Sequence, residues 1–319
     1  MRKNTYDQMR TDINRISIST IKELETEIKN YLDKCGLFYK VFARIKTENS
    51  IIEKLENREK KGIKNYKLQD LVGVRIVLYF KNDIQLCEKL IQQHFEVLNK
   101  SRDFDEPEKF RAQRINYVCR LPENVISNFE SKIWEYPIDK SFEIQIRTIF
   151  SEGWHEIEHD FRYKCLEDWS EFDDLSRTLN GILATLENCD WAISSLFEQV
   201  SYKHYKNSMW IPMLKNVFGI RIADTDGMDE ILSYFDQNRD VAKMFYRIDR
   251  QEFLLWLSDI KNSIPLNLKN LVYLVNAHQI KDEYISGLTP IRLLKLIEEE
   301  QVPITVDELT DEHDFVHEC

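Results

Sequence analysis

The segment Ser141–Lys164, SFEIQIRTIFSEGWHEIEHDFRYK, changes its pattern in the middle. Up to residue 147, apolar Phe142, Ile144 and Ile146 alternate with polar Glu143, Gln145 and Arg147. This two-residue period is typical of a half-buried strand. From about residue 148 the apolar residues recur every three to four positions, which indicates a helix. A strand that carries an acid, an amide and a base on one face and leads directly into a helix predicts one wall of a cleft.

The predicted helix also contains His155-Glu-Ile-Glu-His159, a literal H-E-x-x-H zinc-protease motif. A zinc hydrolase needs a third ligand, and Glu167, Glu171 and Glu187 are only nominal candidates. Such a short motif often occurs by chance, and the preceding Glu-x-Gln-x-Arg has no role in that chemistry. Zinc hydrolysis is therefore the least favoured alternative. We expect His155 to be partly exposed and His159 to be hydrogen-bonded within the cleft wall.

Composition narrows the class of protein. The chain has 319 residues, of which 43% are hydrophobic and 31% charged, enough for one large or two modest domains. The net charge of −11 argues against general nucleic-acid binding through an overall positive field. Six scattered cysteines without C-x-x-C spacing favour reduced thiols. The polar start and the lack of a long apolar run predict a cytoplasmic protein that does not contact membranes.

Strands and helices alternate over the first two thirds of the chain. Helices are expected at residues 6–36, 50–61, 82–95 and 176–200, and strands at 38–46, 71–80, 115–121 and 142–147. The run LVGVRIVLYF at 71–80 is continuous enough for a buried central strand, and 101–114 is expected to be a loop. Beyond residue 205 only amphipathic helical segments are apparent. The prediction is an α+β fold with a mixed sheet, divided into residues 1–205 and a helical accessory domain at 206–319.

Two carboxylates lie at positions where they can meet. Asp70 comes just before the predicted buried strand, and Glu143 lies on the polar face of the strand at 142–147. Carboxylates on adjacent strands can hold Mg²⁺, with water completing the octahedron. Arg44, Lys46, Ser50 and Lys54 supply a basic cluster upstream, and Arg75 alternates onto one strand face. Cations beside a carboxylate pair suit a metal-bound polyphosphate.

The order of these motifs resembles one family. The patterns R-x-K-x-x-x-S-x-x-x-K at 44–54, D-L-V-G-V-R-I-V at 70–77, and E-I-Q-I-R-T with W-x-E-I-E-H-D-x-x-Y-K at 143–164 look like the RelA/SpoT-type alarmone synthetase domain. The resemblance covers about residues 10–200. It implies a nucleotidyltransferase-like core that transfers pyrophosphate from ATP to the 3′-hydroxyl of a guanosine nucleotide. Glu158-His159 belongs to the family pattern, which explains the H-E-x-x-H more simply than zinc does.

The resemblance also implies roles for individual residues. Arg44 and Arg75 would sandwich the adenine of ATP, and Lys46, Ser50 and Lys54 would hold its phosphates. Asp70 and Glu143 would bind magnesium, and Glu143 would help to deprotonate the attacking hydroxyl. Gln145, Arg147, Asn116, Glu158 and His159 would contact the acceptor, with Glu158 facing its base.

The chain departs from the family in the loop before the third strand. There the family carries Lys, Tyr and His at four-residue steps, and the Tyr stacks on the acceptor guanine. This sequence has Glu108, Ala112 and Asn116 instead. Stacking on an aromatic ring contributes about 1–3 kcal/mol per base, so binding of an acceptor guanine is expected to be weakened. The motifs expected to bind ATP are unchanged, so the donor half of the site is expected to be intact.

The preferred hypothesis is therefore a magnesium-dependent pyrophosphokinase with ATP as donor and an uncertain acceptor. Guanosine nucleotides, adenosine nucleotides and, as in toxin members of the family, the 3′ end of tRNA are the candidates. A degenerate synthetase that acts as a nucleotide-binding or protein-interaction module is the main alternative, although the Asp70–Glu143 pair argues against it. A homo-oligomer and a regulatory protein partner for residues 206–319 are further candidates.

Overall fold

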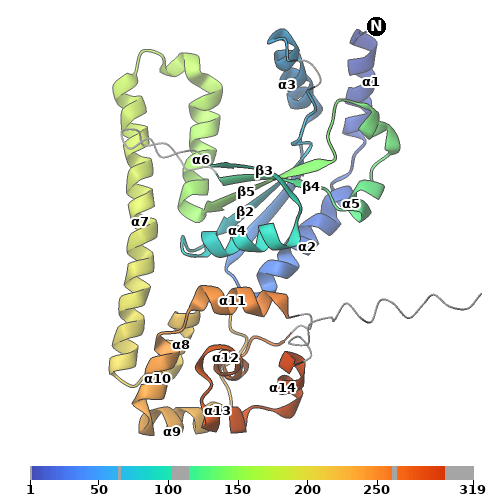
Figure 1. Cartoon of the computed structure of the whole chain (residues 1–319). Helices are drawn as coiled ribbons and strands as arrows, with labels where there is room; N and C mark the ends of the chain where they lie inside the picture. Colours follow the sequence, from blue (N-terminus) through green and yellow to red (C-terminus); the bar gives the residue numbers. More distant parts are fainter. Residues whose placement is uncertain (1, 64–65, 103–114, 261–263, 299–319) are drawn as a thin grey trace, which may run out of the picture. The chain divides into compact units, whose positions relative to one another are not determined.

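The computed structural model describes residues 2–63, 66–102, 115–260 and 264–298 (Figure 1). The chain divides into two compact units, Met1–Ile222 and Ala223–Cys319. The first unit contains every residue for which a catalytic or binding role was predicted. No helix in the described ranges has the length and apolar character needed to span a bilayer.

A mixed sheet forms the centre of the first unit. In the described part of the chain its five strands follow the order β1-β2-β5-β4-β3. Their bounds are β1 Tyr39–Ile45, β2 Val72–Leu78, β3 Val97–Arg102, β4 Ile115–Arg120 and β5 Ser141–Thr148. β2 and β5 run parallel, whereas the other neighbouring pairs are antiparallel. The sheet and its flanking helices confirm the predicted α+β class, and β2 is the expected buried interior strand.

The two faces of the sheet differ in character because side chains alternate along each strand. One face is apolar and buried, with Val74 and Ile76 of β2 and Ile144 and Ile146 of β5. Helices α2 (Lys22–Lys34) and α4 (Asp83–His94) lie against this face (Figure 1). Phe142 on the same face packs edge to face against a phenylalanine at the end of α4, with ring centroids 5.5 Å apart. The polar side chains predicted to act in chemistry therefore occupy the opposite face.

The remaining helices of this unit surround the sheet. They are α1 Arg2–Asn14, α3 Glu48–Lys60, α5 Glu123–Ser127, α6 Ile149–Phe161, α7 Asp173–Lys206 and α8 Trp210–Phe218, with short 3₁₀ turns at Ile18–Ile21, Ser131–Glu135 and Tyr163–Trp169. The helix after β5 is confirmed as α6, and Thr148 caps it by accepting a hydrogen bond from the Ser151 amide. The polar strand therefore passes into the helix without an intervening loop.

Two local predictions were wrong. Residues 6–36 do not form one helix, because Ser17 accepts a hydrogen bond from the Ser19 amide and begins a separate 3₁₀ turn between α1 and α2. Strand β3 was missed because VLNKSR lacks a clean apolar alternation. It is an edge strand with a register shift between Val97 and Asn99, and it includes the first residues of the segment expected to be a loop.

Helix α7 extends through the predicted division at 205/206, and α8 packs back against it. The Ser201 hydroxyl donates to the Met213 carbonyl oxygen at 3.4 Å, and the Asn216 side chain lies 3.0 Å from His204 Nδ1. The compact unit continues to Ile222.

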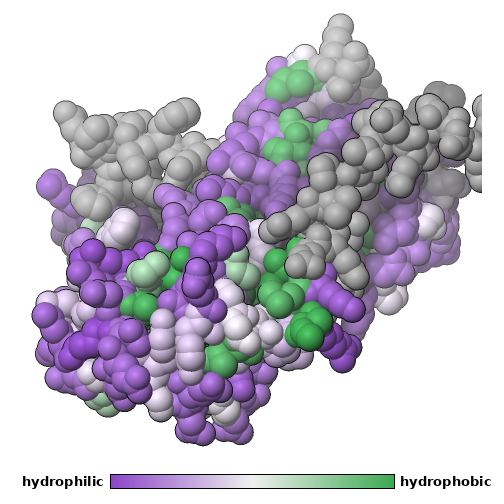
Figure 2. Space-filling view, turned by 60° about the horizontal axis from the view of Figure 1, so that its bottom comes forward, coloured by the Kyte–Doolittle hydropathy of each residue, from purple (hydrophilic) through white to green (hydrophobic). Residues whose placement is uncertain are grey.

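In the described residues of the C-terminal unit, all regular secondary structure is helical, as predicted. Its elements are α9 Asp229–Gln237, α10 Arg239–Tyr246, α11 Arg250–Asp259, α12 Leu268–Val275, a π-helical turn Asn276–Ile280, α13 Glu283–Leu288 and α14 Ile291–Glu298. Phe235, Phe245 and Phe253 are fully buried in its core. On the face drawn in Figure 2, apolar side chains form small patches separated by hydrophilic ones.

Candidate functional site

The polar face of the sheet presents three rows of side chains across neighbouring strands. Residues that pair in register share a face, so the strand pairing defines the rows. They are Arg44, Gly73, Glu143 and Val118; Phe42, Arg75, Gln145 and Asn116; and Lys40, Val77 and Arg147. Arg44, Arg75, Glu143, Gln145, Arg147 and Asn116, all predicted site residues, thus lie on one surface.

Arg44 lies across β2 toward this surface. A Cβ atom added to Gly73 would lie 3.7 Å from Arg44 Nε, which is ordinary van der Waals contact. The arginine side chain therefore occupies the space above the glycine. Gly73 pairs in register with Glu143, so Arg44 lies in the same row as this predicted catalytic residue.

Asp70 lies at the entry to β2, where two lysines converge on it. Lys46 Nζ and Lys54 Nζ lie 2.5 Å and 2.8 Å from the same carboxylate oxygen, Oδ2. Lys46 is held there because its amide donates to the Leu71 carbonyl at 2.8 Å, and α3 brings in Lys54. Burial opposes ionisation, but the two ammonium groups outweigh it and lower the pKa of Asp70. Burial alone would lower the pKa of Lys54, but Asp70, followed by Tyr66 and Glu143, raises it.

The donor atoms at this corner fit a hard divalent cation. Asp70 Oδ1 is buried and accepts no hydrogen bond from any described residue. Glu143 belongs to the parallel strand beside β2, and one of its oxygens accepts from Gln145 Nε2 at 3.1 Å. Among the described residues no cluster of three or more His, Cys, Asp or Glu side chains is arranged around a metal position. Two carboxylates with water and phosphate oxygens are the ligand set that Mg²⁺ commonly takes.

The other end of the polar face is a closed network of charges. Glu152 on α6 bridges two arginines: its Oε1 lies 2.5 Å from Arg75 Nη1 and its Oε2 lies 3.0 Å from Arg147 Nη1. Glu156, one turn later, also pairs with Arg75. Burial alone would lower the pKa of Arg75, but Glu152 and then Glu156 raise it. Arg147 further donates to Gln145 Oε1 at 3.3 Å, so the network continues to the Glu143 row.

Sequence reasoning missed Glu152 and Glu156. Their four-residue spacing puts both on one side of the helix, which was a usable signal. It also missed Phe42, which shares the polar face and pairs in register with Arg75. The Phe42 side chain is 53% exposed, an unusual position for a phenylalanine in a strand. Its place two residues before Arg44 already put it on the same strand face.

The prediction that His155 is partly exposed was wrong, whereas His159 is hydrogen-bonded as expected, although in solvent and not within a cleft wall. His155 is buried at 4% exposure and contacts Trp154 edge to face. The His159 side chain is 53% exposed, with Nδ1 3.0 Å from Asp160, and it stacks on Tyr163. Helix α7 packs against the Trp154 side of α6, where Leu183 contacts Trp154.

Glu158 does not present a free carboxylate. It is buried and accepts hydrogen bonds from Arg162 Nε and Nη2, each at 3.3 Å. Arg162 also donates to Asn180 Oδ1 at 2.9 Å, which ties this pair to α7. To contact an acceptor base, Glu158 would have to share or exchange this partner.

The other predicted residues vary in their surroundings. Ser50 is exposed near the start of α3, and its Oγ accepts from the Thr47 hydroxyl at 2.9 Å. Asn116 Oδ1 is buried without a hydrogen-bond partner among the described residues, so this amide has unused capacity beside Gln145. Glu108 and Ala112 lie outside the described residues.

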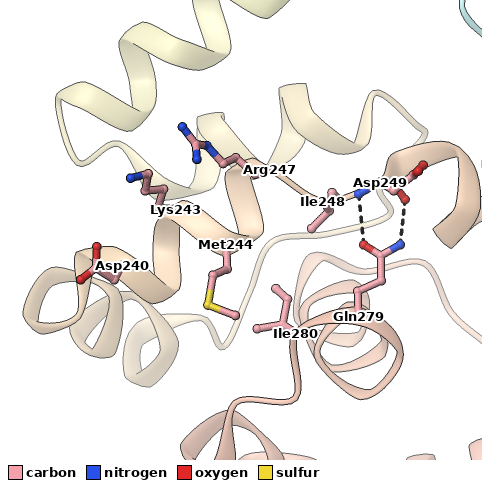
Figure 3. A pocket seen from close by; sticks show the side chains of 8 residues that line it. All are labelled: Asp240, Lys243, Met244, Arg247, Ile248, Asp249, Gln279 and Ile280. Atoms are coloured by element: carbon pink, nitrogen blue, oxygen red, sulfur yellow. Dashed lines mark hydrogen bonds between the residues drawn. The ribbon is translucent and has the colours of Figure 1, made fainter.

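A separate hollow occurs within the C-terminal unit and contains none of the predicted site residues. It lies between the end of α10 and the π-helical turn (Figure 3). Met244 and Ile280 form its apolar part, and Lys243 and Arg247 extend from α10. Gln279 closes one end by accepting from the Asp249 amide at 3.1 Å and donating to its carbonyl at 2.8 Å.

Comparisons with known proteins agree with the geometry of the first unit. Residues 43–168 match the model of a region found in RelA / SpoT proteins. The chain is 29% identical over 132 residues to the GTP pyrophosphokinase YwaC of Bacillus subtilis, a match that covers 40% of this chain and 59% of YwaC. It is 26% identical over 152 residues to the GTP pyrophosphokinase YjbM of the same organism, covering 45% of this chain and 68% of YjbM.

Among solved structures, the small alarmone synthetase 1 from Bacillus subtilis aligns with a TM-score of 0.45 and 22% identity. This alignment covers 62% of this chain and 98% of that structure. The family match at 43–168 includes the corner at Asp70 and every residue of the three rows except Lys40 and Phe42. Residues 43–168 therefore form a RelA/SpoT-type synthetase domain.

Proposed function

We propose that this protein is a pyrophosphokinase that transfers the β,γ-pyrophosphate of ATP to the 3′-hydroxyl of a nucleotide. The observation that carries the proposal is the corner where Lys46 and Lys54 converge on Asp70 beside the strand of Glu143. Cations grouped around a carboxylate with a free, buried oxygen suit a polyphosphate bound through a divalent ion.

In the proposed reaction the acceptor 3′-oxygen bonds to the β-phosphorus of ATP. The bond from that phosphorus to the oxygen bridging to the α-phosphate breaks, and AMP leaves with that oxygen. Glu143 takes the hydroxyl proton, while Lys46 and Lys54 attract the phosphate oxygens. Asp70 and Glu143 are the residues that would hold Mg²⁺, which would neutralise charge on the phosphates.

Arg75 is suited to the donor base in spite of its ion pairs. Its carboxylate partners bond the edge of the guanidinium group, which leaves the planar faces available for stacking on adenine. Phe42 lies in the same row and adds an exposed aromatic surface. We propose that Arg44, Arg75 and Phe42 together bind the purine of ATP.

The acceptor is the less defined half of the proposal. With Ala112 in place of an aromatic platform and Glu158 already bound to Arg162, GDP and GTP are expected to be poor acceptors. An adenosine nucleotide or a tRNA 3′ end, as in toxin-type members, takes the same chemistry. YwaC and YjbM are described as GTP pyrophosphokinases, so guanosine nucleotides remain the reference substrates for the test.

The test incubates the full chain with ATP labelled at the β- and γ-phosphates, Mg²⁺, and GDP, GTP, ADP, ATP or tRNA in turn. We expect labelled product from at least one acceptor, with weaker product from GDP and GTP. Asp70→Asn should remove it, whereas Asp226→Asn, an exposed acid in the C-terminal unit, should not. ATP binding without product from any acceptor would instead support a nucleotide-binding regulatory module.

A further inference from the structure

A buried carboxylate on helix α7 contacts the junction between β5 and α6. Asp190 is 5% exposed, and its Oδ2 accepts a hydrogen bond from the Thr148 hydroxyl at 2.7 Å. Burial raises the pKa of Asp190, while the Thr148 hydroxyl and Lys81 act against this shift. Within the described ranges no basic side chain lies at ion-pair distance from Asp190. An aspartate is rarely buried in this way, because burial penalises the charged form, so its position has a specific reason.

Thr148 connects this carboxylate to the start of α6. Its oxygen also accepts a hydrogen bond from the Ser151 amide at 3.2 Å, which makes Thr148 the N-cap of the helix. A threonine hydroxyl has one proton to donate, and because Asp190 accepts it, the lone pairs remain for the helix amide. Donation to a carboxylate also makes the hydroxyl oxygen a better acceptor. Asp190 therefore orients the capping hydroxyl and strengthens the cap.

The cap holds the turn of α6 that carries Glu152. This residue directly follows Ser151 and lies in the first turn of the helix. Its carboxylate bridges Arg75 and Arg147. Two such hydrogen bonds can form together only over a narrow range of carboxylate positions, because charge-assisted bonds require about 2.7–2.9 Å between nitrogen and oxygen. A shift of this turn would therefore break the bridge between the two arginines.

Helix α7 also runs beside the rest of α6 (Figure 1). Trp154 Nε1 donates to the Leu179 carbonyl oxygen at 3.1 Å, and Arg162 Nη1 donates to Asn180 Oδ1 at 2.9 Å. These two contacts lie in the middle and at the end of α6, whereas the bond from Thr148 lies at its cap. The contact at Asp190 is thus the one suited to control the position of the first turn.

We propose that Asp190 is a positioning residue for the ATP site, which holds the first turn of α6 through Thr148 and so keeps Glu152 between Arg75 and Arg147. The inference rests on the proposed function, in which Arg75 binds the adenine of ATP. Asp190 acts through Thr148 rather than by touching the nucleotide, because Thr148 is out of step with the polar side chains of β5. It also lies outside the family match at 43–168, so the donor site depends on a helix that follows the matched region.

The first test needs no ligand and measures hydrogen–deuterium exchange of backbone amides by mass spectrometry. Asp190→Ala should speed exchange in residues 149–153 about threefold or more, because the cap is weakened, and should leave the end of α6 unchanged. Ser194→Ala is the matched control, since its buried hydroxyl donates to the Asp190 backbone carbonyl at 3.2 Å, within α7. Unchanged exchange at 149–153 in Asp190→Ala would overturn the proposal.

Conservative variants keep this test decisive if Asp190→Ala does not fold, which circular dichroism would reveal. Asp190→Asn retains an oxygen that can accept from Thr148, so its exchange should lie between that of Asp190→Ala and the wild type. Thr148→Ser keeps the hydroxyl and should protect residues 149–153 as the wild type does, whereas Thr148→Val should not. Equal protection in the serine and valine variants would contradict the proposal.

The second test connects this contact to ATP through a double-mutant cycle. Calorimetry with a non-hydrolysable ATP analogue should show a dissociation constant raised about tenfold by Asp190→Ala, as by Glu152→Gln. In the Glu152→Gln background, Asp190→Ala should change it less than about twofold, because the bridge is already lost. Full multiplication of the two losses in the double variant would mean that Asp190 acts by another route, and the proposal would be wrong.

The two tests distinguish failure of this inference from failure of the proposed function. A wild-type protein that bound no ATP analogue would refute the proposed function, and exchange at 149–153 would then decide the role of Asp190 by itself. ATP binding that Asp190→Ala leaves unchanged would refute the inference and leave the proposed function standing.

Discussion

The two ends of the polar sheet face hold their charges in different ways. At the β1–β2 end, two lysines share one oxygen of Asp70, and its other oxygen is buried without a partner among the described residues. At the β5–α6 end, Arg75 and Arg147 are bridged by Glu152. At the β1–β2 end, hydrogen-bonding groups remain available to a ligand. At the β5–α6 end, the arginines and Glu152 already bind one another.

This difference indicates a division of labour. Unpaired capacity is costly in a folded protein unless a ligand uses it, so the Asp70 corner is the place where a metal and phosphates are expected. The network around Glu152 instead fixes the orientation of two arginine planes. One end of the face is suited to a metal ion and phosphates, and the other holds the guanidinium planes of the two arginines in place.

The largest effect is expected from a substitution at Asp70. Asp70→Asn should lower the rate of pyrophosphate transfer by at least about 10³-fold, because it removes a negative ligand from the metal position. Folding should be retained, since the amide can still accept from one lysine. Initial rates measure the loss, and a variant with near wild-type turnover would mean that the metal is held elsewhere.

A smaller effect is expected from the aromatic surface beside Arg75. Phe42→Ala should weaken ATP binding by about 10- to 100-fold, since base stacking on an aromatic ring contributes about 1–3 kcal/mol. Phe42→Tyr should retain affinity, and the nearby Lys40→Ala provides a control on the same strand. Calorimetric titration with a non-hydrolysable ATP analogue gives the values. Equal affinities for Phe42→Ala and the wild type would remove this residue from the donor site.

The substitution Glu152→Gln tests the ion-pair network at the β5–α6 end of the polar face. Losing the carboxylate that bridges Arg75 and Arg147 should raise the KM for ATP about tenfold, with a smaller change in kcat, because the arginine planes lose their orientation. Glu156→Gln should have the weaker effect, since the Glu156 side chain is 56% exposed and does not bridge two arginines among the described residues. If Glu156→Gln proved the more damaging, the assignment of Glu152 as the bridge would be wrong.

The smallest effect concerns stability against acid. The folded pKa of Asp70 is lowered, so its stabilising contribution is present above the unfolded value near 3.9 and is lost as pH falls through the folded pKa. The difference in free energy of unfolding between wild type and Asp70→Asn should therefore be constant near neutral pH and shrink below about pH 4. Urea titrations at several pH values measure it. A difference that grows on acidification would contradict the paired state of Asp70.

Much of this site could be predicted from the sequence, for a physical reason. Alternation along β5 fixes which of Glu143, Gln145 and Arg147 share a face, and a continuous apolar run identifies β2 as an interior strand. Local patterns therefore sufficed where the backbone itself sets side-chain direction. The sequence placed Lys46 and Lys54 in a basic cluster upstream of Asp70, but only the structure shows both lysines at one oxygen of that carboxylate.

The rest depended on packing between elements that are distant in sequence. His155 is buried and His159 is exposed although both lie on one face of α6, a difference that depends on what packs around the helix. Whether Glu152 reaches Arg75 depends on where α6 crosses the sheet, which helical periodicity does not determine. Strand β3 was missed because its polar residues are those of a sheet edge rather than of a buried strand.

In the proposed function, the Asp70 corner positions both outer phosphates of ATP for transfer as one group. The most direct test follows ATP labelled separately at the β- and γ-phosphates during turnover with an active acceptor. We expect both labels to reach the acceptor together, with one AMP released for each product formed. Transfer of the γ-label alone with release of ADP, or tight ATP binding with no AMP from any acceptor, would contradict it.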